Sequence, residues 1–239
     1  MALRLNSSRQ AYKAFPEEGT ASNMGQMPLL IADARVPMSV SQLMQKRLDV
    51  RNYDTSVKSA WMDNYFDTGD AVVYRKDGQV KIVLDSQTLR EMTPDTQRVG
   101  GALLLGDDVY KALQGEEFKR DELGKLGESL SRAQAKSRPV WKALARDKGL
   151  LNDYVDYIFI EGKQRFGYDN AMGVYLSQAQ VNTPEMRAFC VDRLVYRSNT
   201  YGRVDLVSDF GRFVGIAPEA LSACEKTLFE EIKGVSPKK

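Results

Sequence analysis

The sequence predicts an α+β fold, with a small antiparallel sheet centred on a hairpin and with helices dominating the second half. Three observations support this prediction. Short apolar runs flank an Asp-Gly pair at residues 77–78, helical spacing of apolar residues covers residues 139–162, and a further helical pattern closes the chain. Strands gathered in one half and helices in the other are typical of α+β proteins rather than of alternating βαβ units.

The 239 residues are enough for one large domain or two small ones. We expect a polar N-terminal arm over residues 1–27 and a single α+β domain over residues 28–239, with a soft boundary near residues 115–137. Leu29-Leu30-Ile31-Ala32 is predicted to be a strand, and Ser39 or Ser41 is predicted to cap a short helix that runs through Leu48.

The hairpin is predicted from residues 71–75 and 80–84. Asp77-Gly78 is the preferred pair for a two-residue type I′ turn. The register that this turn implies places Ala71, Val73, Val80 and Ile82 on one face of the hairpin. Residues 102–105 are predicted to add a third strand and residues 109–113 a helical turn, while residues 116–134 are charged and compatible with a helix.

Two consecutive helices are predicted over Pro139–Gly162, with Gly162 as the C-terminal cap of the second. Thr183-Pro184-Glu185 is a good helix start, and the helical spacing of the apolar residues that follow predicts a helix through Leu194. Residues 204–214 indicate strand and turn. A last helix is predicted from Pro218, with one face formed by Leu221, Cys224, Leu228 and Ile232.

Composition excludes several classes of function. The sequence has no histidine, so it cannot form a Ser-His-Asp triad, a Cys-His dyad or a His-ligated zinc site. It has 34 Lys+Arg against 32 Asp+Glu, a balance that makes nucleic acid an unlikely partner. Two cysteines, the lack of an apolar run long enough to span a membrane and the lack of a secretory signal favour a soluble cytoplasmic protein without a membrane partner.

Three groups of residues are candidate sites, each with an ordinary structural alternative. Asp63, Asp67 and Asp70 could hold a divalent metal, or they could be solvated turn residues. Arg138, Lys142 and Arg146 are four residues apart and could bind phosphates along a helix, or they could simply be solvent-facing. A Tyr/Arg-rich second half could line a ligand pocket, for which we select Tyr154, Tyr157, Arg165, Tyr168, Arg193 and Arg197.

These groups lead to three functional hypotheses. The first is a binding or interaction protein without catalytic activity, which uses the Tyr/Arg-rich half for a small anionic ligand or for self-association into a homo-oligomer. The second is an enzyme that depends on carboxylates and a divalent metal, and the third is nucleic-acid binding through the basic helix. No cofactor is implied by a motif, since the sequence contains neither GxxxxGK[ST] nor GxGxxG.

Overall fold

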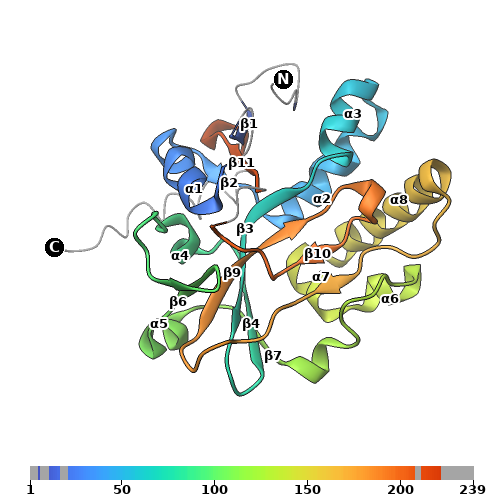
Figure 1. Cartoon of the computed structure of the whole chain (residues 1–239). Helices are drawn as coiled ribbons and strands as arrows, with labels where there is room; N and C mark the ends of the chain where they lie inside the picture. Colours follow the sequence, from blue (N-terminus) through green and yellow to red (C-terminus); the bar gives the residue numbers. More distant parts are fainter. Residues whose placement is uncertain (1–4, 6–10, 17–20, 208–210, 222–239) are drawn as a thin grey trace.

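A large mixed β-sheet forms the middle layer of the protein, with helices on both faces (Figure 1). The computed structural model describes residues 5, 11–16, 21–207 and 211–221, and eleven strands of these residues join one sheet. The main path of the sheet runs, in spatial order, through β1 (Tyr12–Phe15), β11 (Phe213–Ile216), β3 (Phe66–Tyr74), β9 (Glu185–Val191), β10 (Thr200–Tyr201) and β8 (Val174–Tyr175).

Five short strands extend this path at its sides. They are β2 (Val36–Pro37) on β11, β4 (Gln79–Val83) on β3, β7 (Glu116–Lys119) on β4, β6 (Ala102–Leu104) on β9, and β5 (Arg98–Val99) on β6. The pairs β3–β11 and β8–β10 are parallel, and the remaining pairs of described strands are antiparallel.

The prediction of a small sheet centred on one hairpin is therefore wrong. Its main error lies at residues 185–191, which were predicted to start a helix and instead form β9, a central strand that pairs with β3, β6 and β10. Every residue of β9 is buried, because both faces of the sheet are covered by helices. A strand buried on both faces shows no alternation of polar and apolar residues, so the sequence lacks the two-residue period that would indicate a strand.

The hairpin of β3 and β4 is confirmed, but its turn and its register differ from the prediction. Arg75 pairs with Gln79, so the loop has three residues, and only Gly78 adopts a positive φ, of 85°. A three-residue loop of this kind carries a left-handed residue at its end. The extra residue shifts the pairing by one position. Tyr74 therefore lies opposite Val80 and Val72 opposite Ile82, and these four residues belong to one face.

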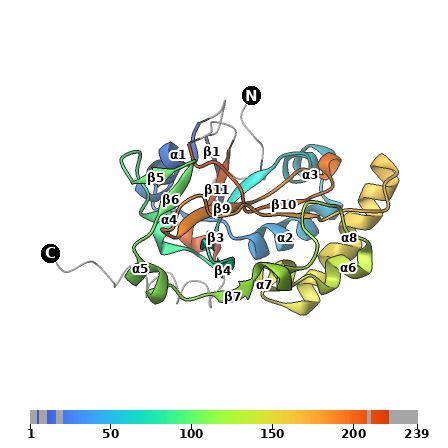
Figure 2. The same ribbon diagram turned by 60° about the horizontal axis from the view of Figure 1, so that its bottom comes forward.

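One face of the sheet packs on five helices, which form the larger core (Figure 2). They are α2 (Val40–Asp49), α3 (Thr55–Met62), α6 (Arg132–Ser137), α7 (Pro139–Ala145) and α8 (Lys148–Phe166). The predicted cap of α2 is confirmed, since the Ser39 hydroxyl accepts from the Gln42 backbone amide and the Ser39 backbone amide donates to Gln42 Oε1. The predicted helix pair is confirmed as α7 and α8. However, Gly162 lies inside α8, which ends at Phe166 and is capped by Gly167.

The opposite face packs on α1 (Asn23–Ala32), α4 (Gln87–Arg90) and α5 (Asp107–Ala112), which form the smaller core. Residues 29–32, predicted as a strand, are the last turn of α1. The helical prediction for residues 109–113 is confirmed by α5 and the third strand by β6. Most of residues 116–134 form β7, a 3₁₀ turn η2 (Arg120–Leu123) and loop rather than a helix.

The ends of the described chain contribute to the sheet. β1 lies within the predicted N-terminal arm and pairs with β11. A strand was predicted within residues 204–214, and β11 confirms it only for the last two of these residues. Three further 3₁₀ turns among the described residues are η1 (Val50–Asn52), η3 (Leu194–Tyr196) and η4 (Pro218–Ala220). Residues 222–239, which include most of the predicted last helix, lie outside the described residues. No described helix is long and apolar enough to cross a membrane.

Candidate functional site

A cleft opens at the end of the sheet where β3 begins and β9 ends. Its volume is about 470 Å³. Its lining comes from four segments of the chain. They are the residue before β3, the end of β9 with the loop into β10, the last residue of β10 with the residues after it, and the residue at the start of the segment into β11. The lining residues are Tyr65, Cys190, Asp192, Arg193, Tyr196, Tyr201, Arg203, Val204, Asp205 and Gly211, and we call this pocket the Tyr/Arg cleft.

Arginine and tyrosine side chains pack against one another along this cleft. The guanidinium of Arg203 lies 5.3 Å from the ring centroid of Tyr201 and 5.4 Å from that of Tyr175, and the two rings stack at 4.8 Å. Arg193 lies 4.9 Å from the ring centroid of Tyr196. No hydrogen bond or ion pair to another described residue engages the Arg203 guanidinium. The cleft therefore presents a cation that is held in place by ring faces.

The floor of the cleft contains buried ionisable groups. Burial raises the pKa of the Cys190 thiol, so the thiolate is disfavoured and the thiol is a poor nucleophile. Asp67 lies opposite Cys190 in the sheet and is fully buried. Burial raises the pKa of Asp67 to about 7. These groups favour a neutral floor beneath a cationic and aromatic wall.

The Asp67 carboxylate also fixes the chain that enters β11. Its Oδ2 atom accepts a hydrogen bond from the Arg212 amide at 2.8 Å, and the Asp67 amide donates to the Arg212 carbonyl at 2.9 Å. A Cβ atom on Gly211 would lie 2.1 Å from Asn23 Oδ1 and 2.2 Å from Asp67 Oδ2. Only a residue without a side chain fits here, which lets the chain pass closely along the cleft floor.

Of the six predicted Tyr/Arg residues, the structure places Arg193 in the cleft. The hydroxyl groups of Tyr154 and Tyr168 are engaged in the core, the first with Arg47 at 2.9 Å and the second with the Leu194 carbonyl at 2.8 Å. The other three lie on the helical side. Tyr157 is half-buried beside Lys58, Arg165 pairs with Asp63 at 2.7 Å, and Arg197 donates to the Asn170 carbonyl at 2.7 Å.

Tyr65 is one of the cleft residues that sequence reasoning missed. It lies just before β3, in a stretch from which the aspartates were selected as candidate metal ligands and the tyrosine was not. Tyr196, Tyr201 and Arg203 belong to the Tyr/Arg-rich half as a whole. No local pattern separates them from the tyrosines of α8, because the β9–β10 pairing that brings them together was not predicted.

The three predicted metal ligands point to different partners. Asp63 pairs with Arg165, Asp67 accepts from the Arg212 amide, and Asp70 pairs with Arg146 at 2.9 Å. Within the described ranges, no group of three or more Asp, Glu, Cys or His side chains is arranged to hold a metal ion. The structure thus does not bring these aspartates together as a ligand set.

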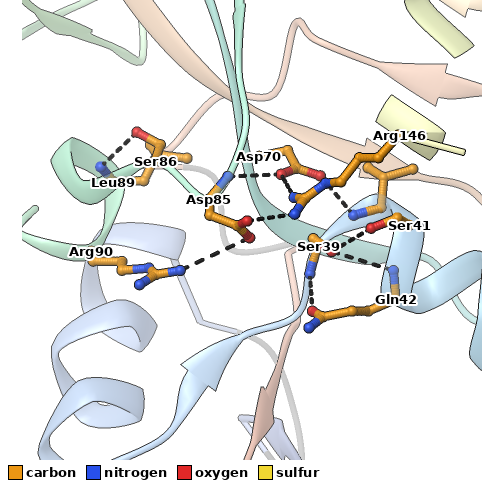
Figure 3. A network of polar contacts seen from close by, with 10 residues as sticks. Ser39, Ser41, Gln42, Asp70, Asp85, Ser86, Leu89, Arg90 and Arg146 are labelled. Atoms are coloured by element: carbon orange, nitrogen blue, oxygen red, sulfur yellow. Dashed lines mark hydrogen bonds and ion pairs between the residues drawn. The ribbon is translucent and has the colours of Figure 1, made fainter. Parts of the chain in front are cut away.

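Arg146 belongs to a polar network rather than to an outward-facing stripe (Figure 3). Its guanidinium bonds Asp70 and, at 2.6 Å, Asp85. Asp70 is fully buried and also accepts from the amides of Val40 and Asp85. Burial raises the pKa of Asp70 above its usual value, and Arg146 opposes this rise.

The other two residues of the predicted stripe are positioned differently from Arg146. Arg138 precedes α7 and donates to the Leu123 carbonyl at 3.1 Å, while Lys142 is exposed on α7. The three cations therefore do not form one continuous phosphate-binding face.

Comparison with known proteins gives the fold. No family model matches the chain, and no curated protein matches it. A solved structure from work on the accommodation of massive sequence variation in Nanoarchaeota by the C-type lectin fold is similar, with a TM-score of 0.65 and 15% sequence identity. The match covers 88% of this chain and 100% of that chain. The protein thus has a fold similar to the C-type lectin fold, which accounts for the large mixed sheet.

Proposed function

We propose that the protein is a binding protein without catalytic activity, and that it binds an anionic ligand in the Tyr/Arg cleft. The observation that carries the proposal is the Arg203 guanidinium, which lies in the cleft beside the stacked rings of Tyr175 and Tyr201 with no carboxylate partner among the described residues. An arginine held by its packing loses little entropy on binding, and its fork-shaped donor set suits a carboxylate or phosphate.

The remaining cleft residues favour a ligand with a planar part next to its anionic group. Tyr65, Tyr196 and Tyr201 supply ring faces, and a volume of about 470 Å³ suits a small molecule or a few side chains of a partner. Asp192 and Asp205 lie in the same lining and would disfavour a ligand of high negative charge. A singly or doubly charged planar anion fits these features best.

The similar solved structure is compatible with this proposal. Its C-type lectin fold is described as accommodating massive sequence variation. We infer that the fold of this chain likewise leaves the cleft side chains open to ligand-specific change. A cytoplasmic location is part of the proposal, since Cys190 is a free thiol and a reducing compartment preserves free thiols.

Self-association is a second candidate function, and a specific observation favours it. Val195 and Tyr196 are adjacent and 44% and 54% exposed, and Tyr196 lines the cleft. Exposed aromatic and apolar residues beside arginines are typical of protein interfaces. Native mass spectrometry of the full chain and of Tyr196→Ser tests this candidate. A dimer that the substitution dissociates supports self-association, and a monomeric wild type refutes it.

The anion proposal is tested with phenyl phosphate, a planar anion, by isothermal titration and by line broadening of its NMR signals. We expect Arg203→Gln to weaken binding by roughly tenfold, because a charge-assisted hydrogen bond is lost. Arg132→Gln is the matched control, since Arg132 lies on α6 and pairs with Asp156. Absence of binding to the wild type, or equal binding by both variants, would refute the proposal.

A further inference from the structure

Arg47 is the most unusual buried residue of the described chain, and it stands directly behind the Tyr/Arg cleft. It is on α2 and is fully buried. Its five N–H groups are all used. Nε donates to the Trp61 carbonyl at 3.0 Å, Nη1 to the hydroxyls of Tyr154 at 2.9 Å and Ser198 at 3.4 Å, and Nη2 to the carbonyls of Asn64 and Asp192 at 3.1 Å each.

None of these five acceptors is a carboxylate, and no ion pair joins Arg47 to another described residue. Burying a cation without a directly bonded counter-ion is costly. Here backbone carbonyls and hydroxyls offset that cost, together with the Asp192 carboxylate at longer range. A leucine or methionine would fill the same space at lower cost. The geometry therefore indicates that Arg47 has a role other than filling the core.

The acceptors show what that role is. One nitrogen, Nη2, joins the carbonyl of Asn64 to the carbonyl of Asp192. The next residue after each of these, Tyr65 and Arg193, lines the cleft, and Asp192 itself lines it as well. A single guanidinium thus ties together two chain segments that line the cleft, and we call these segments its two walls.

The loop on the second wall also needs to be held. Arg197 and Ser198 are consecutive non-glycine residues with φ angles of 69° and 47°. Two left-handed residues in a row are unfavourable for side-chain-bearing residues and persist only where surrounding contacts fix them. Arg47 supplies two such contacts at the ends of this segment, through the Asp192 carbonyl and the Ser198 hydroxyl.

We propose that Arg47 is a positioning residue that preforms the Tyr/Arg cleft by joining its two walls at Asn64 and Asp192. This inference rests on the proposed function for its biological meaning, but the positioning itself is a property of the free protein. Arg47 does not touch the ligand. It determines where Tyr65, Arg193 and Tyr196 stand before a ligand arrives, which reduces the entropy lost on binding.

The test uses 3-fluorotyrosine incorporated into the full chain, with fluorine NMR signals assigned by single Tyr→Phe substitutions. Tyr65 and Tyr196 report on the two walls, and Tyr110 on α5 is the remote reference. In Arg47→Met we expect the Tyr65 and Tyr196 signals to shift and broaden while the Tyr110 signal stays in place. We also expect phenyl phosphate binding to weaken by roughly tenfold.

A milder variant keeps the proposal testable if Arg47→Met does not fold. Ser198→Ala removes one of the five acceptors, and we expect smaller changes at the same two tyrosines. Ser86→Ala is the matched control, because Ser86 is an equally buried serine that caps α4. We expect it to lower stability without moving the Tyr65 and Tyr196 signals.

Unchanged Tyr65 and Tyr196 signals in folded Arg47→Met, or in Ser198→Ala where Arg47→Met does not fold, would overturn the positioning role. Failure of the wild type to bind phenyl phosphate would instead overturn the anion proposal, and the fluorine signals would still decide the role of Arg47. The two inferences are therefore refuted by different measurements.

Discussion

Replacing Arg146 by methionine should cost about 3 kcal/mol of unfolding free energy. Breaking a buried ion pair by removing one partner typically costs about 3–5 kcal/mol, because the other charge stays buried. Asp70 is fully buried, but the Arg146 side chain is 31% exposed, so the lower end of the range applies. Asp70 also keeps two amide donors, Val40 and Asp85.

The same substitution at Arg132 provides the comparison. Arg132 pairs with Asp156 at 2.7 Å, and both side chains are more than a third exposed. An exposed pair of this kind contributes about 0–1 kcal/mol. Arg146 adopts a left-handed backbone conformation with φ of 63°, but methionine and arginine share that cost. The difference between the two variants thus reports on the buried carboxylate.

The assay is urea unfolding at pH 7, supported by thermal unfolding. For a chain of this size, a loss of about 3 kcal/mol lowers the melting temperature by roughly 6–12 °C. The loss in Arg146→Met should shrink as the pH falls through about 6, because burial raises the pKa of Asp70 to about 6 and protonation removes the buried charge. Adding Asp70→Asn should recover most of the loss. Equal losses for Arg146→Met and Arg132→Met would refute the reasoning.

Three further predictions concern other residues. Burial raises the pKa of Asp67 from its usual 3.8 to about 7 in the folded protein. The free energy of unfolding therefore falls as the pH rises between these two values, by about 4 kcal/mol at most. Asp67→Asn should remove that dependence in urea titrations between pH 4 and 8, and an unchanged slope would contradict it. Gly162→Ala should lower the free energy of unfolding by about 1–3 kcal/mol in the same assay, because its Cβ would lie 2.1 Å from the buried Tyr168 ring. This loss should exceed the gain from the better helix propensity of alanine. A gain in stability would count against this contact. Tyr196→Ala should change the free energy of unfolding by less than about 0.5 kcal/mol, since the side chain is 54% exposed. The same substitution should weaken phenyl phosphate binding, as measured by calorimetry. A large loss of stability would show that Tyr196 is structural.

The local features of this fold were predictable from sequence because they depend on neighbours in the chain. The cap at Ser39, the helix pair α7 and α8, and the presence of a hairpin near Gly78 each follow from residues within a few positions. The register of that hairpin was not predictable from the Asp-Gly pair alone. A three-residue loop uses the same glycine and moves every partner by one position.

The centre of the sheet could not be predicted from periodicity. β9 is buried on both faces, so Met186 contacts one core and Phe189 the other, and their spacing resembles that of a helix. Thr183-Pro184-Glu185 strengthened the wrong prediction, because a helix start and the entry to a strand can share the same residues. With β9 misassigned, the partners of β3 and the strands beyond it were lost as well.

The cleft was out of reach for the same reason, and Arg47 shows why. Sequence rules place an arginine in an amphipathic helix on its solvent face, because burying an unpaired charge is costly. The structure buries this one completely and surrounds it with five neutral acceptors from four segments. The free-energy cost of burying Arg47 is consistent with a role in positioning other residues, and two of its acceptors, the carbonyls of Asn64 and Asp192, belong to the segments that line the cleft. The residue that breaks the sequence rule therefore points to the site that the sequence did not reveal.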